Sequence, residues 1–199
     1  MKLGTIEGGG TKFVVGVGDE NGNIFERESF PTTTPEETMK KTIEFFKDKG
    51  VEAIGFGSFG PIDPDKTSPT YGNVTTTPKP GWSNHNVVKD LEEAFPGVPV
   101  GFDTDVNSAC LGEVEFGAAK GLNSALYLTI GTGVGGGVMH QKQLFPMIHK
   151  YVQEMLNGYV AKEEITTDKI KDYIVYPGLA DNAGLCGGLA LAKQALKNK

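Results

Sequence analysis

A glycine-rich turn near the N-terminus combines small residues with a hydroxyl and a cation. Its sequence is Glu7-Gly8-Gly9-Gly10-Thr11-Lys12, and it lies between two predicted strands. Such a turn can offer backbone N–H groups, the Thr11 hydroxyl and the Lys12 ammonium to a phosphate. It is not a Walker loop, because the order G-x-x-x-x-G-K-[ST] is absent and no helix follows directly. A mobile glycine hairpin without a ligand is the competing interpretation, although hairpin loops rarely need three glycines.

A second cluster places two carboxylates and an amide where a strand ends and a helix begins. Its sequence is Asp103-Thr104-Asp105-Val106-Asn107. A carboxylate at the start of a helix is favoured by the helix dipole and stays ionised. It could then accept the proton of a substrate hydroxyl as that hydroxyl attacks a phosphoryl group. Plain N-capping by Asp and Asn explains the same residues equally well, so this motif alone leaves both interpretations open.

The third cluster is a glycine run that follows another predicted strand. The segment from Gly131 to Gly137, Gly-Thr-Gly-Val-Gly-Gly-Gly, satisfies the G-x-G-x-x-G pattern of dinucleotide-binding sites. Such a site also requires a helix at once and an acidic residue that ends the next strand. The residue about twenty positions on, Glu154, falls inside a predicted amphipathic helix. We therefore discount a dinucleotide site.

Histidines and cysteines give little sign of a metal centre. His85, His140 and His149 show no metal-ligand spacing, and surface or loop positions are expected for them. Cys110 and Cys186 have no C-x-x-C partner, which argues against a disulfide framework or a cysteine zinc site. We expect both cysteines to be small buried apolar residues.

Residues 64–84 form a long irregular segment rich in Pro, Thr, Gly and Asn. A loop of this length in a compact domain is more often a binding segment than filler. Lys79 and Trp82 in it could contact a sugar, by a hydrogen bond and by stacking. They could equally pack a lid, and the sequence leaves both interpretations open.

Composition excludes several classes of partner. The chain has 199 residues and a net charge of −6, without a Lys/Arg cluster, which argues against nucleic acids and anionic membranes. No run of eighteen apolar residues is present to span a bilayer. The start, MKLGTIEGGG, lacks the basic and apolar regions of a signal peptide. We therefore expect a cytoplasmic protein with no nucleic-acid or membrane partner.

The predicted elements place the three clusters at the ends of strands. Strands are predicted over Leu3–Ile6, Phe13–Val17, Ile24–Phe30, Ala53–Gly57, Val98–Phe102, Ala125–Ile130 and Tyr173–Tyr176. Helices are predicted from Thr34 to about Lys49, over Val87–Phe95, from Asp103-Thr104-Asp105 to about Ala118, and over Ala183–Leu196. Strands that come first and then alternate with helices indicate an α/β fold with a mixed sheet, whose ligands bind where strands end.

The segment after the glycine run allows two predictions. Val138–Phe145 could form a hairpin strand, or a loop that leads into a helix. Leu144, Ile148 and Met155 belong to an apolar pattern with helical spacing that persists to Leu156. We therefore predict the loop and the helix.

Taken together, the motifs resemble those of the ROK family, especially its fructokinase branch. The matching stretches are Gly4-Thr5-Ile6-Glu7-Gly8-Gly9-Gly10-Thr11-Lys12-Phe13, Gly57-Ser58-Phe59-Gly60-Pro61-Ile62-Asp63, Thr76-Thr77-Pro78-Lys79-Pro80-Gly81-Trp82, Asp103-Thr104-Asp105-Val106-Asn107 through Gly112-Glu113, and Thr129-Ile130-Gly131-Thr132-Gly133-Val134-Gly135. The resemblance is continuous from residue 1 to about residue 137. Five motifs in the family's order make it highly specific.

The resemblance implies an α/β fold of the actin-like ATPase (ribonuclease H-like) type, with nucleotide in the cleft between two lobes. Residues 1–118 would form an intact N-terminal lobe with the sugar site and a phosphate loop. Residues 119–199 would form a shortened C-terminal lobe on the nucleotide side. The function implied is ATP- and Mg²⁺-dependent phosphorylation of a hexose, with fructose converted to fructose 6-phosphate as the leading expectation.

The same resemblance assigns roles to individual residues. Asp105 matches the family's catalytic base, which deprotonates the sugar hydroxyl that attacks the γ-phosphate. The remaining matches are Gly9, Gly10, Thr11 and Lys12 in the first phosphate loop, Thr132 and Gly133 in the second, and Gly60, Pro61 and Asn107 at the sugar site. Glu7 stands where many family members carry Asp, and is similar to the fructokinase branch.

The chain departs from the family pattern after the glycine run. Gly135–Gln141 resembles a later family element that touches adenosine, here joined directly to the earlier one, and residues 138–199 resemble the family's C-terminal end. About a hundred residues of the second lobe are missing by this comparison, comparable to a small domain. The family's sugar-holding Glu-x-Gly-His segment and its zinc-binding His/Cys cluster have no counterpart, so no zinc site is expected.

Three functions are compared on this basis. The first is a working fructokinase-like enzyme that binds a hexose and ATP. The second is an internally deleted kinase remnant with at most weak nucleotide or sugar binding. The third, a sugar-responsive transcription regulator of the same family, is disfavoured because such proteins carry an N-terminal DNA-binding module. A homodimer is left open, since chains could exchange surfaces to replace the absent part.

Overall fold

A five-stranded mixed sheet forms the centre of the protein. The structure, a computed structural model, describes residues 1–130, 134–140, 175 and 177–198. The strands are β1 (Leu3–Gly8), β2 (Lys12–Gly18), β3 (Ile24–Pro31), β4 (Ala53–Ser58) and β7 (Val100–Thr104), in the order β3-β2-β1-β4-β7. β1 pairs antiparallel with β2 and parallel with β4, and β4 pairs parallel with β7. The mixed sheet predicted from the sequence is therefore present.

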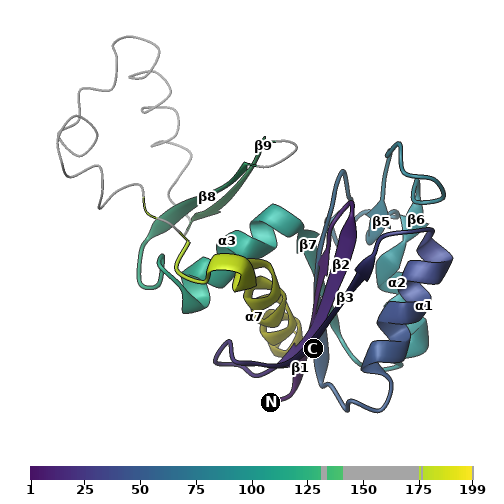
Figure 1. The fold of residues 1–199 in the computed structure, drawn as a ribbon, viewed down its shortest axis with the longest axis horizontal. Coiled ribbons are helices and arrows are strands. Elements are labelled where there is room, and N and C mark those ends of the chain that lie inside the picture. The colour runs from purple at the N-terminus through teal and green to yellow at the C-terminus, as the bar shows by residue number, and fades with distance from the viewer. Residues whose placement is uncertain (131–133, 141–174, 176, 199) are drawn as a thin grey trace, which may run out of the picture.

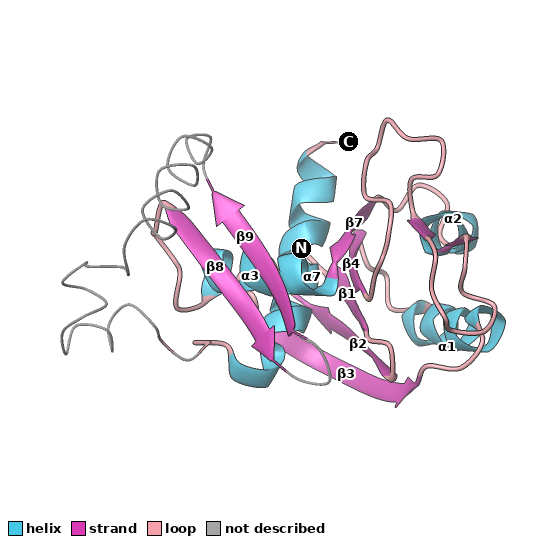
Figure 2. Ribbon diagram, turned by 90° about the horizontal axis from the view of Figure 1, so that it is seen from above, coloured by secondary structure: helices cyan, strands magenta, loops and turns pink. Residues whose placement is uncertain are grey.

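Helices cover both faces of this sheet (Figures 1 and 2). One face carries α1 (Pro35–Phe46) and α2 (Val87–Ala94), and the other carries α3 (Asp105–Phe116) and α7 (Ala183–Lys197). Side chains of a strand point alternately to the two faces. Ile54 and Phe56 accordingly join the core beneath α1 and α2, whereas Ala53 packs with Leu189 of α7.

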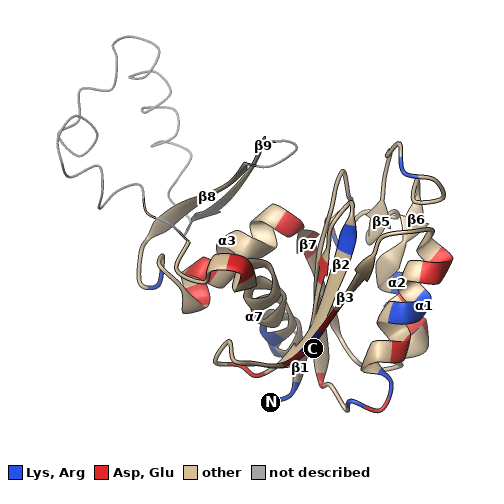
Figure 3. Cartoon of the chain, in the orientation of Figure 1, with Lys and Arg blue, Asp and Glu red and all other residues tan. Residues whose placement is uncertain are grey.

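The two helices on the α1 side are amphipathic and begin where the sequence predicts. Thr34 is the N-cap of α1, and its side-chain oxygen accepts a hydrogen bond from the Glu37 backbone N–H at 3.4 Å. Asn86 caps α2 in the same way, accepting from the Lys89 backbone N–H at 2.8 Å. Acidic and basic residues both occur on α1 and α2 (Figure 3), while the inward faces bury apolar side chains.

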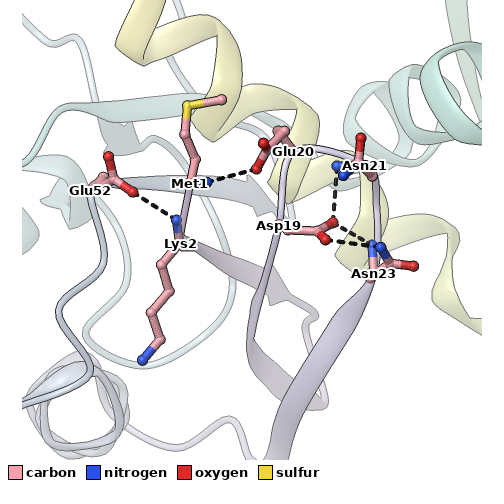
Figure 4. Close-up of polar contacts among 7 residues, drawn as sticks. All are labelled: Met1, Lys2, Asp19, Glu20, Asn21, Asn23 and Glu52. Carbon is pink, nitrogen blue, oxygen red and sulfur yellow. Dashed lines mark hydrogen bonds and ion pairs between the residues drawn. The ribbon is translucent and has the colours of Figure 1, made fainter.

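The turn between β2 and β3 is closed by a single carboxylate (Figure 4). Asp19 Oδ1 accepts hydrogen bonds from the backbone N–H groups of Asn21 and Asn23, at 2.9 and 3.0 Å. The N-terminal ammonium of Met1 lies 2.9 Å from Glu20 Oε2 in the same turn. Local side-chain contacts thus fix the hairpin between β2 and β3.

The last helix packs unusually closely on the sheet and on α3. A Cβ atom added to Gly55 of β4 would lie 1.8 Å from the Gly188 carbonyl oxygen, and one added to Gly187 would lie 1.8 Å from that of Ser108. Thr5 Oγ1 of β1 donates to the Leu185 carbonyl at 2.7 Å. α7 therefore completes the layer over β1 and β4, although the sequence division at residue 118 assigns it to the second lobe. That division stays a prediction.

A separate two-stranded sheet follows α3. It consists of β8 (Ser124–Ile130) and β9 (Val134–His140), which pair antiparallel from Ser124↔His140 to Ile130↔Val134. The predicted loop over Val138–Phe145 is wrong for Val138–His140, which belong to β9. Apolar spacing further along the chain favoured the helix, but the backbone groups of β8 also need a ladder partner, and the glycine run supplies it.

The remaining elements are short. The long loop contains β5 (Asn73–Val74) and is followed by β6 (His85–Asn86), and η1 (Ala180–Asn182) leads into α7. The predicted helix near residues 144–156 lies outside the described residues, as does the predicted strand over Tyr173–Tyr176 except for an exposed Val175. Among the helices that the structure describes, none combines the length and the apolar character needed to cross a membrane.

Candidate active site

The glycine-rich turn joins β1 to β2 and is held by backbone hydrogen bonds. Gly9 N–H donates to the Lys12 carbonyl at 2.9 Å, which closes the turn. Thr32, just after β3, donates its N–H to the Thr11 carbonyl at 2.9 Å and its hydroxyl to the Gly9 carbonyl at 2.6 Å. The turn is therefore braced by the neighbouring strand, and its backbone is not a free hairpin tip.

The acidic cluster lies where β7 ends and α3 begins. Thr104 is the N-cap of α3, because its hydroxyl accepts the Asn107 backbone N–H at 3.1 Å. Asp103 Oδ1 accepts hydrogen bonds from the Thr104 N–H at 2.7 Å and from Asn107 Nδ2 at 2.9 Å. Asp105 Oδ1 accepts the Val106 N–H at 2.8 Å. Capping thus falls to Thr104, which leaves the Asp105 carboxylate available for other chemistry.

A cavity of about 580 Å³ brings the two clusters together. Its lining residues come from β1, β2 and β3, from the first turns of α3 and α7, from η1 and from β8. The lining residues are Glu7, Lys12, Val14, Arg27, Ser29, Asp105, Val106, Ala109, Tyr127, Thr129, Ala180, Asp181, Ala183, Gly184 and Leu185. Its volume lies within the range of small-molecule sites, and charged side chains enter it from several elements.

Two carboxyl groups of this cavity have raised pKa values. Burial is the main cause of the raised pKa of Glu7; the charges of Asp105 and Asp181 add to it, and Lys12 opposes it. Burial also raises the pKa of Asp105, against the stabilising hydrogen bond from the Val106 N–H. Carboxyl groups with raised pKa values in a cleft are typical of proton-transferring or ligand-binding sites.

The predicted site residues fall on neighbouring strand ends. Lys12 and Asp105 line the same cavity, and Gly9, Gly10 and Thr11 form the turn before Lys12. Gly60 and Pro61 follow β4, where the Phe59 N–H donates to the Gly8 carbonyl at 2.6 Å, and Asn107 lies in the first turn of α3. Thr132 and Gly133 lie outside the described residues. The roles assigned to all these residues stay predictions.

The position of Trp82 decides between the two interpretations of this residue in the long loop. Trp82 is fully buried against Phe13 and Phe59, and its indole N–H donates to the Thr33 carbonyl at 2.7 Å. It therefore packs the loop onto the core and cannot stack on a sugar. Lys79 lies beside the glycine turn, since a Cβ added to Gly10 would meet Lys79 Cε at 3.1 Å.

Sequence reasoning missed several residues of the cavity, among them Arg27, Ser29, Tyr127 and Asp181. The alternation of side chains along β2 and β3 could have identified some of these residues. Val14 pairs with Ser29 in the β2–β3 ladder, and Lys12 lies two residues before Val14. Because residues two apart point to the same face, Lys12, Ser29 and Arg27 share a face. The contributions of Tyr127 and Asp181 depend on how β8 and α7 pack, which no local pattern encodes.

Known proteins share both sequence and fold with this chain. The model of the ROK family matches residues 3–146. The fructokinase of Pediococcus pentosaceus is 35% identical over 293 residues, an alignment that covers 100% of each chain. The fructokinase of Lactococcus lactis subsp. cremoris is 52% identical over 136 residues, which cover 68% of this chain and 46% of the relative.

Solved structures of ROK proteins have a fold similar to that of this chain. A ROK family glucokinase from Streptomyces griseus, crystallised with glucose and AMPPNP, has a TM-score of 0.61 at 28% identity and covers 72% of this chain and 46% of its own. A ROK hexokinase from Thermus thermophilus has a TM-score of 0.70 over 100% of both chains, and at 22% identity it supports the fold alone.

The comparisons also confirm the expected shortening. The alignment with the Pediococcus relative has 293 positions and this chain has 199 residues, so the difference of 94 positions has no residue here. Over the matched part alone, the chain spans about half the length of the Lactococcus relative.

Proposed function

Because this chain belongs to the ROK family, we propose that it transfers a phosphoryl group from ATP to a hydroxyl of a hexose, with fructose as the first substrate to test. The observation that supports this proposal most directly is the shared cavity of Lys12 and Asp105. A phosphate-binding cation and a carboxylate with a raised pKa are the two protein groups that such a transfer uses.

In this proposal, Asp105 acts as the general base. Its carboxylate accepts the proton of the sugar hydroxyl as the hydroxyl oxygen attacks the γ-phosphorus and the bond to the β-phosphate oxygen breaks. A raised pKa makes this carboxylate a better proton acceptor. Lys12 and the backbone of the glycine turn stabilise the negative charge of the phosphates, so catalysis rests on positioning and electrostatics.

A magnesium ion would fit this cavity together with a nucleotide. Among the described residues, no cluster of three His, Cys, Asp or Glu side chains could hold a metal alone. Mg²⁺ is usually bound by one or two carboxylates and by substrate phosphates. The Glu7 carboxylate, which lines the cavity together with Asp105, could supply such a ligand. The ion would neutralise charge on the phosphates.

Fructose is proposed ahead of other hexoses because of the relatives' names. Two relatives named fructokinase are 35% and 52% identical to this chain, and the structure bound to glucose is 28% identical. A cytoplasmic location is part of the same proposal. A homodimer is compatible with this proposal, and sedimentation velocity tests it.

Steady-state ADP formation with Mg²⁺, ATP and each of fructose, glucose and mannose tests the proposal. We expect turnover with fructose that depends on both substrates. Titration of the same sample with ATP and with fructose by calorimetry separates catalysis from binding. Binding without turnover would identify a kinase remnant, and the absence of both would overturn the proposal.

A further inference from the structure

Arg27 lies on β3 and faces the cavity, although no motif includes it. In the β2–β3 ladder, Arg27 pairs with Gly16 and Ser29 pairs with Val14. Val14, Arg27 and Ser29 all line the cavity, as does Lys12 at the start of β2. Arg27 is also the sole arginine of the sequence. The chain therefore contributes its one guanidinium to the same wall as the phosphate-loop lysine.

A hydrogen bond to Asn182, which does not itself line the cavity, holds the guanidinium. Its Nη1 donates to the side-chain oxygen of Asn182 at 3.2 Å, and Asn182 ends η1 directly before α7. This contact uses one of the five N–H donors of an arginine. Within the part of the chain that the structure describes, Arg27 makes no ion pair with a carboxylate. Its remaining donors are therefore available to a ligand.

Acidic side chains outnumber basic ones in the cavity, so an anionic ligand would need Arg27 as well as Lys12. Three carboxylates line the cavity, Glu7, Asp105 and Asp181, against two cations, Lys12 and Arg27. A polyphosphate would be repelled by the acids unless cations and a metal ion faced it. Arg27 pairs with Gly16, which lies four residues after Lys12 on β2. At the usual rise of a strand, these two positions are about 13 Å apart. Two long side chains at that separation can contact different phosphates of one chain.

We propose that Arg27 binds the polyphosphate of the nucleotide as a second cation beside Lys12, and that Asn182 is a positioning residue that orients its guanidinium. Arginine suits this task because its planar donors contact phosphate oxygens in pairs. This inference rests on the proposed kinase function. It adds a residue on an edge strand of the sheet to the phosphate site, outside both glycine clusters.

Calorimetric titrations with Mg²⁺-ATP, Mg²⁺-ADP and AMP test the inference. Arg27→Gln keeps a donor for Asn182 and removes the charge, so we expect ATP to bind about 10- to 100-fold more weakly. The loss should be smaller for ADP and smallest for AMP. Arg27→Lys, which keeps the charge but loses the paired donors, should fall between wild type and Arg27→Gln. Asn182→Ala should raise the KM for ATP and leave the KM for fructose unchanged.

Lys41→Ala is the matched control. Like Arg27, Lys41 is a cationic residue, but it lies on α1 at the opposite face of the sheet. Its Nζ is 5.9 Å from the ring centre of Phe30. Its loss should leave all three affinities unchanged. Melting curves of each variant establish that the fold is intact. If Arg27→Gln does not fold, the single variants Arg27→Lys and Asn182→Ala decide whether Arg27 binds the polyphosphate.

The possible outcomes separate the two proposals. ATP binding by wild type with equal binding by Arg27→Gln and Arg27→Lys would overturn the role of Arg27 and leave the kinase function standing. An equal loss for ATP and AMP would move the contact to the nucleoside and overturn the polyphosphate assignment. No ATP binding by the wild type would overturn both proposals.

Discussion

Two neighbouring aspartates of the same motif have different surroundings. The Asp103 carboxylate accepts hydrogen bonds from the Thr104 N–H and from the Asn107 amide, which lock the start of α3. The Asp105 carboxylate lines the cavity and accepts one backbone N–H, that of Val106. The contrast gives Asp103 a structural role and is consistent with the chemical role proposed for Asp105.

We expect Asp105→Asn to lower kcat/KM for fructose phosphorylation by about 10²- to 10⁴-fold, the usual contribution of a general base. The amide keeps an oxygen for the Val106 N–H but cannot take up a proton at neutral pH. Rates of ADP formation measure the effect. Asp48→Asn, which changes an exposed aspartate after α1, is the control and should be as active as wild type. An active Asp105→Asn enzyme would remove this residue from the mechanism.

The same substitution should stabilise the fold at neutral pH. Burial raises the pKa of Asp105 above its ordinary value of 3.8, so the folded state disfavours the ionised form that neutral pH imposes. This destabilising contribution is present above the folded pKa and disappears as the pH falls through it to the unfolded value. Asp105→Asn should therefore melt above wild type at pH 7, and the difference should vanish near pH 3. A pH-independent difference would contradict burial as the cause.

At the scale of elements, α3 joins the sheet, the cavity and the last helix. Glu113 of α3 is 4% exposed, and its carboxylate accepts backbone N–H groups of Ala118, Gly178 and Leu179 at 2.7, 3.0 and 2.9 Å. These contacts connect the end of α3 with the segment that leads into α7. Glu113, the last residue of the motif that ends in Gly112-Glu113, thus has a structural role.

Glu113→Ala should lower the free energy of unfolding by about 2–5 kcal/mol, because buried N–H groups lose their acceptor. Glu113→Gln retains one acceptor oxygen and should cost less. Urea denaturation at constant m-value measures both effects. In the exposed pair of Lys89 and Glu93, whose charged atoms are 3.7 Å apart, Glu93→Ala should change stability by less than about 1 kcal/mol. If Glu113→Ala and Glu93→Ala lowered the free energy of unfolding equally, the contacts of Glu113 would not be stabilising.

Close packing of α7 gives a second expectation for the elements. Gly187→Ala would place a methyl group 1.8 Å from the Ser108 carbonyl oxygen, so α3 and α7 must separate. We expect a loss of about 1–3 kcal/mol in the free energy of unfolding, as for other overpacked sites. Gly136→Ala on β9, whose methyl group would meet Leu128 at an ordinary 3.5 Å, should be nearly neutral. A neutral Gly187→Ala variant would mean that the helices are not in contact there.

At the scale of the whole molecule, the two-stranded sheet of β8 and β9 has one covered face and one open face. Tyr127 and Thr129 line the cavity on the α3 side, whereas Leu126 and Leu128 on the other side are 63% and 55% exposed. No charged residue interrupts β8 (Figure 3). Paired exposed leucines on an uncharged strand favour association with other apolar surfaces.

We therefore expect the protein to self-associate as its concentration rises, and Leu126→Thr with Leu128→Thr to reduce that association. Threonine keeps the preference for strand, so the melting temperature should change little. Sedimentation velocity at several concentrations measures the effect. As a control, Phe25→Thr changes another exposed side chain, 63% exposed on β3, and should leave association unaltered. Unchanged association of the double variant would exclude this face as the contact.

Local sequence alone predicts much of this protein. Residue types along the chain predict β1 to β4, β7 and β8 and the start of α1, since these signals act between residues close in the chain. The glycine turn and the acidic strand end were recognisable from residue types for the same reason. The family and its shortening followed from motifs in order, and the comparisons confirm both.

Tertiary structure decides which distant residues share a site. The pairing of β9 with β8, the burial of Trp82 and the entry of Arg27 and Tyr127 into one cavity depend on contacts between segments far apart in the chain. Such contacts lower the free energy through backbone pairing and burial that no single segment can achieve alone. Sequence thus determines the chemical groups that are available, and packing determines which of them face one another.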